Sequence, residues 1–220
     1  MIVLEGVSKR YENQDALKDV SLRIEKGEMA FVTGPSGAGK TTLFKLLYLA
    51  EAPDEGLISI AGFNTASLDD STIPMLRRNI GVVFQDFKLL NNNTVFDNIA
   101  LALRIRRVME REIKEKVTAV LKLVGLRHKA DAYPLTLSGG EQQRITIARA
   151  IVGEPTVMLA DEPTGNLDIE NEEGIMKIFK LINNKGTTIL IASHNRRLFD
   201  NTGRRVFYLD GGQLVKAEVR

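Results

Sequence analysis

The most informative segment of this 220-residue chain is Gly34-Pro35-Ser36-Gly37-Ala38-Gly39-Lys40-Thr41. It matches the pattern G-x-x-x-x-G-K-[ST], in which backbone N–H groups surround phosphate oxygens while the lysine and the hydroxyl reach phosphate and Mg²⁺. An apolar stretch, residues 29–33, precedes it, and a helical pattern, residues 40–49, follows it. Because this chemistry requires a strand, a loop and a helix in that order, we expect a phosphate-binding loop rather than a glycine-rich turn.

A second segment, Leu137-Ser138-Gly139-Gly140-Glu141, lies further along the chain. Ser138 and Glu141 have the spacing of a capping box, so the segment could simply start a helix. Two glycines in a first helical turn cost backbone entropy, however, and are better explained where the backbone must approach a ligand closely. Since a helix N-terminus favours anions, we predict that Ser138, Gly139 and Gly140 bind a γ-phosphate.

Composition limits the possible classes of protein. With 44% hydrophobic residues, the chain has enough apolar side chains for one core, or a core and a small subdomain. Thirty basic and 28 acidic residues leave a formal charge of +2, which argues against nucleic-acid binding. Cysteine is absent, which excludes disulfides, thiolate metal sites and thiol catalysis, and two histidines are too few for a His-rich metal site.

The sequence contains no candidate signal peptide or membrane span. The first residues have no basic start or apolar core of signal-peptide length, and no window approaches the roughly 18 apolar residues of a span. We therefore expect a cytoplasmic protein. If it works at a membrane, another subunit must supply the membrane part.

Short apolar runs alternate with helical patterns along the chain. The segment 210–212 has turn chemistry and predicts a hairpin between the last two strands. Strand and helix alternation around the phosphate loop predicts an α/β fold with a mostly parallel, helix-covered sheet. The predicted strands are residues 2–7, 22–24, 29–33, 57–60, 80–84, 157–160, 188–192, 206–209 and 213–216, and the predicted helices start at Lys40, Pro74, Val95, Glu110, Gly140, Glu170 and Arg196.

Residues 87–137 are almost entirely helix-patterned and interrupt the strands, so they predict a helical subdomain. One helical face within them is apolar and followed by a glycine suited to a C-terminal cap, Gly125. We interpret that face as core packing rather than as a binding surface. Its residues are Ile113, Val117, Val120, Leu121 and Val124.

An acidic pair, Asp161 and Glu162, follows the apolar run 157–160. Alone, such a pair is often only a turn. In a chain with a phosphate loop, we expect Asp161 to hold Mg²⁺ through its water shell and Glu162 to orient and deprotonate the attacking water. His194 follows the strand 188–192, at the end where ligands bind in open α/β sheets, and is a candidate contact of the γ-phosphate.

Together these motifs resemble the nucleotide-binding domain of the ATP-binding cassette (ABC) family, over essentially all 220 residues. The resemblance implies one domain, 1–220. Its expected fold is an α/β P-loop NTPase core with a mostly parallel sheet, an antiparallel β subdomain and an inserted α-helical subdomain at about residues 87–137. ATP and Mg²⁺ are the implied cofactors.

The resemblance also implies residue roles. Tyr11 is similar to the aromatic that stacks on adenine, and Gln85 to the glutamine that links Mg²⁺ to the helical subdomain. The catalytic set is then Glu162, His194, Lys40 and Gln85, and the metal set is Thr41, Gln85 and Asp161. The expected nucleotide contacts are Tyr11, the Walker A residues Gly34, Pro35, Ser36, Gly37, Ala38, Gly39, Lys40, Thr41 and Thr42, the signature residues Ser138, Gly139 and Gly140, and Asp168 of the D-loop Asn166-Leu167-Asp168.

Two positions depart from the family pattern. The signature ends in Glu141, where glutamine is more usual, and Asn195 follows the switch histidine, where aspartate is common. Neither change removes a catalytic group.

Residues 137–168 resemble a subgroup that contains lipoprotein-releasing, macrolide-exporting and cell-division ATPases, without choosing among them. Ala38 and the segment 76–90 look like the cell-division branch. That resemblance implies a permease-like integral membrane partner at the cytoplasmic face of the inner membrane, whose signal activates peptidoglycan hydrolases outside the cell. An ATPase subunit of a lipoprotein-releasing or macrolide exporter is the alternative.

Family resemblance also implies an ATP-dependent homodimer, in which the signature of one chain completes the ATP site on the phosphate loop of the other. Force would reach the partner through Gln85 and residues 86–93, at the edge of the groove that receives a coupling helix. A non-hydrolytic nucleotide sensor and a small-molecule kinase are competing classes. Glu162 and His194 argue against the sensor, and the signature Ser138 to Glu141 is unexplained in a kinase.

Overall fold

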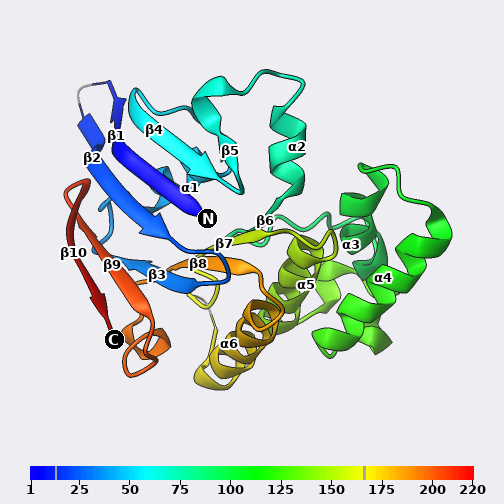
Figure 1. Ribbon diagram of the computed structural model, residues 1–220. Helices are drawn as coiled ribbons and strands as arrows, with labels where there is room; N and C mark the ends of the chain where they lie inside the picture. Colours follow the sequence, from blue (N-terminus) through cyan, green and yellow to red (C-terminus); the bar gives the residue numbers. More distant parts are fainter. Residues whose placement is uncertain (13, 166) are drawn as a thin grey trace.

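The computed structural model describes residues 1–12, 14–165 and 167–220, which form two sheets and a group of helices (Figure 1). The first sheet is antiparallel, with the order β2-β1-β4-β5. The second has the order β10-β9-β3-β8-β7-β6, and its strands are parallel except for β10. The strands are β1 Ile2–Tyr11, β2 Gln14–Ile24, β3 Met29–Thr33, β4 Glu55–Ile60, β5 Phe63–Asn64, β6 Ile80–Val83, β7 Val157–Asp161, β8 Thr188–Ala192, β9 Arg205–Asp210 and β10 Gln213–Val219.

Six α-helices and four short 3₁₀ turns complete the described part of the chain. The predicted α/β class, the mostly parallel sheet and the final hairpin are confirmed. Predicted helix starts agree within one residue, apart from the one at Arg196. The helices are α1 Lys40–Leu47, α2 Ile73–Arg78, α3 Val95–Arg104, α4 Glu110–Leu123, α5 Gly139–Ile151 and α6 Ile169–Asn183, and the turns are Thr65–Ser67, Arg127–Lys129, Pro134–Thr136 and Arg196–Leu198.

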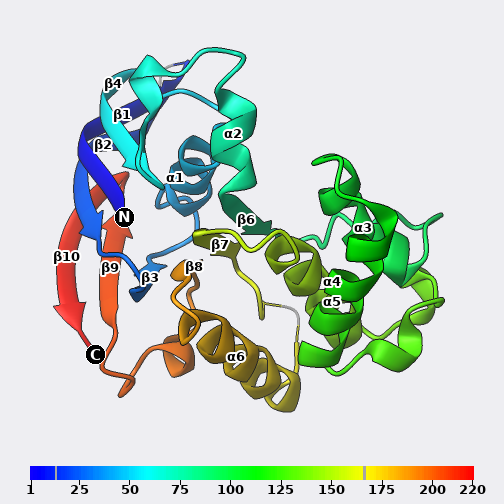
Figure 2. The ribbon, with the colours of Figure 1, turned by 45° about the vertical axis from the view of Figure 1, so that its right-hand side comes forward.

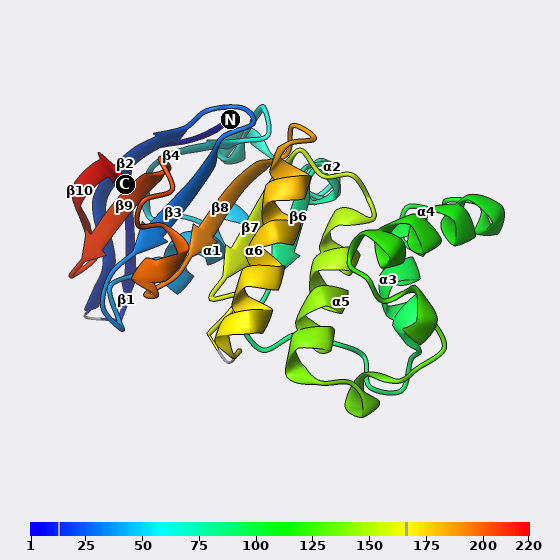
Figure 3. The same cartoon turned by 90° about the horizontal axis from the view of Figure 1, so that it is seen from below.

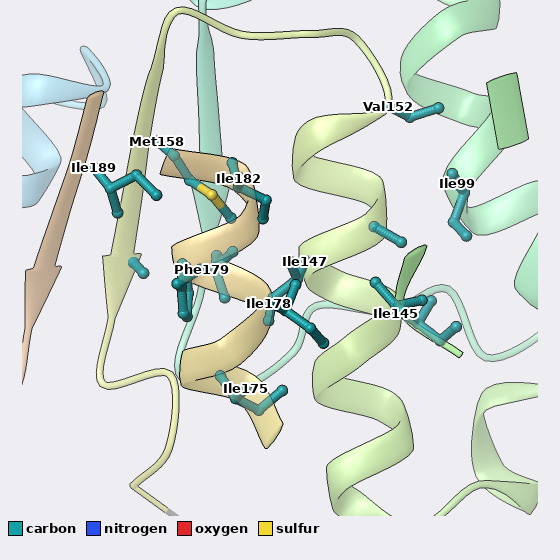
Figure 4. Close-up of a cluster of buried hydrophobic side chains, with 14 of the residues drawn as sticks. Ile99, Ile145, Ile147, Val152, Met158, Ile175, Ile178, Phe179, Ile182 and Ile189 are labelled. Atoms are coloured by element: carbon teal, nitrogen blue, oxygen red, sulfur yellow. The ribbon is translucent and has the colours of Figure 1, made fainter. Parts of the chain in front are cut away.

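The parallel sheet is buried on both faces, which explains its continuous apolar strands. Along β3, Met29 and Phe31 pack with the helices α5 and α6, whereas Ala30 and Val32 pack with α1 and the antiparallel sheet. Figure 4 shows the helix side of this core, with Met158 and Ile189 of the sheet facing Phe179 and Ile182 of α6. Two separate apolar clusters therefore hold the strand that leads into the phosphate loop.

Helices α3, α4 and α5 lie between β6 and β7 in sequence and project to one side of the sheet (Figures 2 and 3). The predicted apolar face of α4 is buried at Ile113, Val117 and Leu121, and Val124 beyond its end is buried too, while Val120 is partly buried. Gly125 has φ +75°, as expected for a residue that ends a helix in the left-handed region.

Three local predictions were wrong or incomplete. The helix predicted from Arg196 is a single 3₁₀ turn, capped by the Asn195 side chain. Strand β2 begins at Gln14 rather than near Leu22. The sequence pattern did not show its first part, because Asp19 has φ +47° and the register shift at Val7 and Val20 breaks the alternation of apolar residues. Strand β5 was not predicted, because its two residues are too few to show the alternation of apolar and polar side chains that indicates a strand.

Candidate active site

The phosphate loop joins β3 to α1 and lies at the carboxyl end of the parallel sheet. A Cβ atom at Gly34 would lie 2.0 Å from the carbonyl oxygen of Leu209, so only glycine fits where the loop leaves the strand. In the part of the chain that the structure describes, no side chain caps α1 at Gly39. Its first backbone N–H groups are therefore available to an anion.

Lys40, the first residue of α1, folds back over this loop. Its Nζ donates hydrogen bonds to the carbonyl oxygens of Gly34 at 2.7 Å and Pro35 at 3.0 Å. The ammonium group is thus held beside the loop that would surround the phosphates, and its contacts are with neutral carbonyl groups. A phosphate oxygen would make a stronger, charge-assisted contact with the same group.

The acidic pair lies at the end of β7, next to the loop. Burial raises the pKa of Asp161, and the neighbouring charge of Glu162 raises it further, while the Thr41 hydroxyl and Lys40 act in the opposite direction. A carboxylate that has lost part of its hydration gains from a cation placed against it. Thr41, Asp161 and Gln85 offer the oxygen ligands that Mg²⁺ prefers, so these residues fit the metal.

Glu162 is held in an unusual backbone conformation, with φ +44°. Its side chain is 11% exposed and accepts a hydrogen bond from the Ser193 hydroxyl at 3.3 Å. The His194 Nδ1 lies 2.9 Å from its other carboxylate oxygen. Both contacts come from residues directly after β8, the strand next to β7, and each one meets a different oxygen of the carboxylate. Backbone strain of this kind concentrates at functional sites.

Tyr11, at the end of β1, lies close to the phosphate loop. Its hydroxyl donates to the carboxylate of Glu51, which also pairs with Lys45 at 3.0 Å. The ammonium groups of Lys9 and Lys45 each lie 5.8 Å from the centre of the ring. The ring, 38% exposed, is thus anchored beside the phosphate loop.

One cleft of about 660 Å³ brings most of the predicted site residues together. They come from five separate parts of the chain: Tyr11 ends a strand of the antiparallel sheet, and the other four lie at or just after the carboxyl ends of strands in the parallel sheet. Its lining also includes Gln14 and Ala16, which sequence reasoning missed because the start of β2 was missed. The predicted residues in the lining are Tyr11, Gly34, Pro35, Ser36, Gly37, Ala38, Gly39, Lys40, Thr41, Thr42, Gln85, Asp161, Glu162 and His194.

Ser138, Gly139 and Gly140 do not line this cleft but lie at the N-terminus of α5. The predicted capping box is present: the Ser138 hydroxyl accepts from Glu141 N at 3.2 Å, and Glu141 accepts from Ser138 N at 2.9 Å. Gly139 is exposed, whereas a Cβ at Gly140 would lie 2.4 Å from the Asn171 side chain. Packing within the chain is thus one reason for the second glycine.

Asp168 also lies outside the cleft lining and caps α6, accepting from Asn171 N at 2.8 Å. Asn166, of the predicted D-loop, is outside the described residues. Ser193 was not predicted as a site residue, although its position directly before His194 was a usable signal.

Comparisons with known proteins agree with this geometry. The family model for the ABC transporter matches residues 17–165. A dimeric structure of a bacterial ABC transporter cassette superposes with a TM-score of 0.91, at 36% identity over 100% of this chain and 98% of that one. A dimeric structure of an ATP-binding cassette in a post-hydrolysis state, bound to ADP and Pi, superposes with a TM-score of 0.90 at 35% identity, over 100% of this chain and 98% of that one.

The chain therefore belongs to the ABC transporter family and is an ATP-hydrolysing cassette. Within the family it is similar to proteins named cell division ATP-binding protein FtsE. It is 48% identical to that of Streptococcus pneumoniae serotype 2 strain D39, over 99% of this chain and 95% of the relative. It is 47% identical to the protein of Bacillus subtilis strain 168, over 100% of this chain and 97% of the relative. It is 46% identical to the protein of Escherichia coli strain K12, over 97% of each chain.

Proposed function

We propose that this chain is the ATPase of a cell-division complex with an FtsX-like membrane protein, and that ATP binding and hydrolysis switch that partner's signal to peptidoglycan hydrolases. Similarity to FtsE proteins over nearly the whole chain supports the role in division. One observation carries the mechanism: the cleft contains the groups for hydrolysis but lacks the signature residues.

Within the cleft, each residue has a distinct task. Lys40 and the free N–H groups of α1 bind the β- and γ-phosphates, and the ring of Tyr11 stacks on the base. Bound Mg²⁺ would neutralise phosphate charge, with Thr41, Asp161 and Gln85 on its coordination sphere. Glu162 takes the proton of the attacking water, and His194 holds Glu162 and contacts the γ-phosphate.

The exposed tip of α5 supplies the missing half of the site from a second chain. Ser138 and the backbone N–H groups of the tip would face the γ-phosphate opposite Lys40, and Asp168 would lie near the same interface. Two chains would then enclose two ATP molecules, and loss of the γ-phosphate would release them. This is the reason to expect a homodimer that forms with ATP.

Association with a membrane would depend on the partner. None of the helices in the described ranges is long and apolar enough to cross a bilayer. A groove of about 420 Å³ between α2, β6, α3 and α5 is a candidate docking surface for the partner. It carries the exposed Arg77 and Arg78 beside Ile105, which is 67% exposed, and so suits an amphipathic acidic segment.

Reconstitution in vesicles tests this proposal. We expect an FtsX-like membrane protein from the same organism to bind the chain and stimulate its ATPase, and a lipoprotein-releasing or macrolide-type permease to do neither. Glu162→Gln in the same vesicles should abolish the stimulated rate while keeping the complex together. Stimulation by the exporter permease alone would favour the alternative function.

A further inference from the structure

Arg149, in the last turn of α5, links that helix to the segment that follows Gln85. Its guanidinium donates to the carbonyl oxygen of Lys88 at 2.6 Å and to that of Phe87 at 2.8 Å. Both acceptor residues are in the left-handed region, with φ +56° at Phe87 and +49° at Lys88. Non-glycine residues adopt that conformation only where their surroundings enforce it, so this turn is specifically held.

The guanidinium has no carboxylate partner among the residues that the structure describes. Burial lowers the pKa of Arg149, with no opposing charge to offset it. A desolvated charge without a counter-ion is expensive to keep, and a neutral side chain would fill the space with less loss. Among the residues that the structure describes, the hydrogen bonds of this group go to the carbonyl oxygens of Phe87 and Lys88, so holding that segment is what offsets the cost.

The same segment is also fixed at its far end. Asn98 of α3, which is fully buried, accepts from Leu90 N at 2.8 Å and donates to Leu90 O at 3.0 Å and Asn93 O at 3.2 Å. The stretch from Gln85 to Asn93 is thus tied to α5 at its start and to α3 at its end. Gln85 is two residues from the nearer attachment and lines the nucleotide cleft.

Helix α5 carries both Arg149 and, at its N-terminus, Ser138. The two residues are eleven positions apart on one rigid helix, a rise of about 16 Å. A turn of α5 that moves the Ser138 tip must therefore also move the Phe87 and Lys88 carbonyls.

We propose that Arg149 is a positioning residue for hydrolysis: it places Gln85 in the cleft according to the orientation of the helix that bears Ser138. The proposal rests on the proposed function of the cleft. The position of Gln85 would then depend on the orientation of α5 in the same chain. Hydrolysis in one ATP site would in turn respond to what the Ser138 end of that helix binds in the second ATP site.

Arg106 provides a matched control. It lines the same groove, and its guanidinium also bonds backbone carbonyls, those of Gly153 at 2.6 Å and of Arg78. Neither acceptor belongs to the segment after Gln85. Loss of Arg106 removes a comparable, partly buried arginine without releasing that segment.

The test is a double-mutant cycle on the full chain with Mg²⁺ and ATP. Arg149→Met should lower kcat about ten- to a hundredfold, since small misplacement of a catalytic group has effects of that size. ATP binding in Mg²⁺-free buffer should stay within about twofold, because the residues that bind the phosphates and base are untouched. Arg149→Lys should recover part of the rate, because one ammonium group reaches either carbonyl but lacks the planar fork.

Combination with Gln85→Ala decides the role. If Arg149 acts through Gln85, adding Arg149→Met to the Gln85→Ala variant lowers kcat by less than about a further twofold. Adding Arg106→Met to the same variant should instead multiply the two effects on kcat. Independent, multiplying effects of Arg149→Met and Gln85→Ala, or an unchanged kcat in Arg149→Met, would overturn the proposal. If Arg149→Met does not fold, Arg149→Lys carries the same cycle.

Failure of the proposed function gives a different result. In that case the wild-type chain either does not hydrolyse ATP or is not stimulated by the FtsX-like protein, and no Arg149 variant is needed to see it. Hydrogen exchange gives a second readout of the inference: amides of residues 86–90 should exchange faster in Arg149→Met and at the wild-type rate in Arg106→Met.

Discussion

The nucleotide cleft and the tip of helix α5 have similar chemistry but opposite surroundings. Glu162 in the cleft is nearly buried and contacted by Ser193 and His194, whereas Ser138 and Gly139 at the tip are exposed. The cleft collects residues from five parts of the chain, and the tip satisfies its polar groups through its own capping box. One chain thus groups the residues predicted for hydrolysis in one cleft and leaves the predicted phosphate contacts of the α5 tip outside it.

Loss of the carboxylate in the cleft should have the largest effect. Glu162→Gln keeps the shape and removes the base, so we expect hydrolysis to fall by about 10²- to 10⁴-fold while ATP binding is retained. ATP should then hold the dimer together, which size-exclusion chromatography with light scattering would show. Turnover near the wild-type rate, measured with the membrane partner present, would remove Glu162 from the mechanism.

Loss of the loop cation should come next. Lys40→Ala removes the charge-assisted contacts with the phosphates, each about 1.5–3 kcal/mol, so ATP affinity should fall about ten- to a hundredfold. Isothermal titration calorimetry measures this directly. Lys26→Ala, at an exposed lysine outside the cleft, is the control and should bind ATP as the wild type does. Unchanged affinity in Lys40→Ala would refute its role.

A change at the helix tip separates its two roles. Ser138→Ala loses a helix cap, worth about 1 kcal/mol of stability, and in the dimer also loses a phosphate contact. Thr94→Ala loses an equivalent cap, since the Thr94 hydroxyl accepts from Asp97 N at 3.1 Å, but on α3. Both should unfold at similar urea concentrations, and only Ser138→Ala should lower the ATPase rate, by about tenfold. Equal rates in the two variants would contradict a role for the tip.

The smallest effect is the change in folding stability that we expect at Asp161. Its pKa is raised in the folded chain, so the ionised carboxylate destabilises the nucleotide-free protein at neutral pH, and this penalty disappears as the pH falls. Asp161→Asn should therefore raise the unfolding temperature by about 2–4 °C at pH 7.5, and the gain should shrink toward pH 4. The same variant should lose Mg²⁺-dependent ATP binding. Thermal scans at both pH values check the sign; a variant less stable than the wild type at pH 7.5 would contradict it.

Much of the fold and of the cleft could be predicted from sequence because the signals are local. Residues 29–33 and the loop after them occupy adjacent positions in the chain, so pattern alone predicts their order. Strand β2 was largely missed because the irregular register at Asp19 places Leu17 and Val20 three residues apart instead of two. The helix predicted at Arg196 is a single 3₁₀ turn instead, because the backbone leaves the helical region at Phe199, where φ is −126°.

Contacts across elements were beyond prediction from sequence. The approach of His194 to Glu162 depends on the register of β7 and β8, and the reach of Arg149 to Lys88 spans 61 positions. Residue type alone does not distinguish such an arginine from a surface one. The roles of the site residues remain predictions that the variants above address.

Crosslinking is the sharpest test of an ATP site shared between two chains, because the sequence contains no cysteine. One chain would carry Ser36→Cys at the exposed phosphate loop and another Ser138→Cys at the exposed helix tip, both in the Glu162→Gln background. With a short bismaleimide, we expect a crosslinked dimer of the two chains with Mg²⁺ and ATP, and little with ADP. No crosslink under any nucleotide condition, or one that forms equally without nucleotide, would contradict a site shared between two chains.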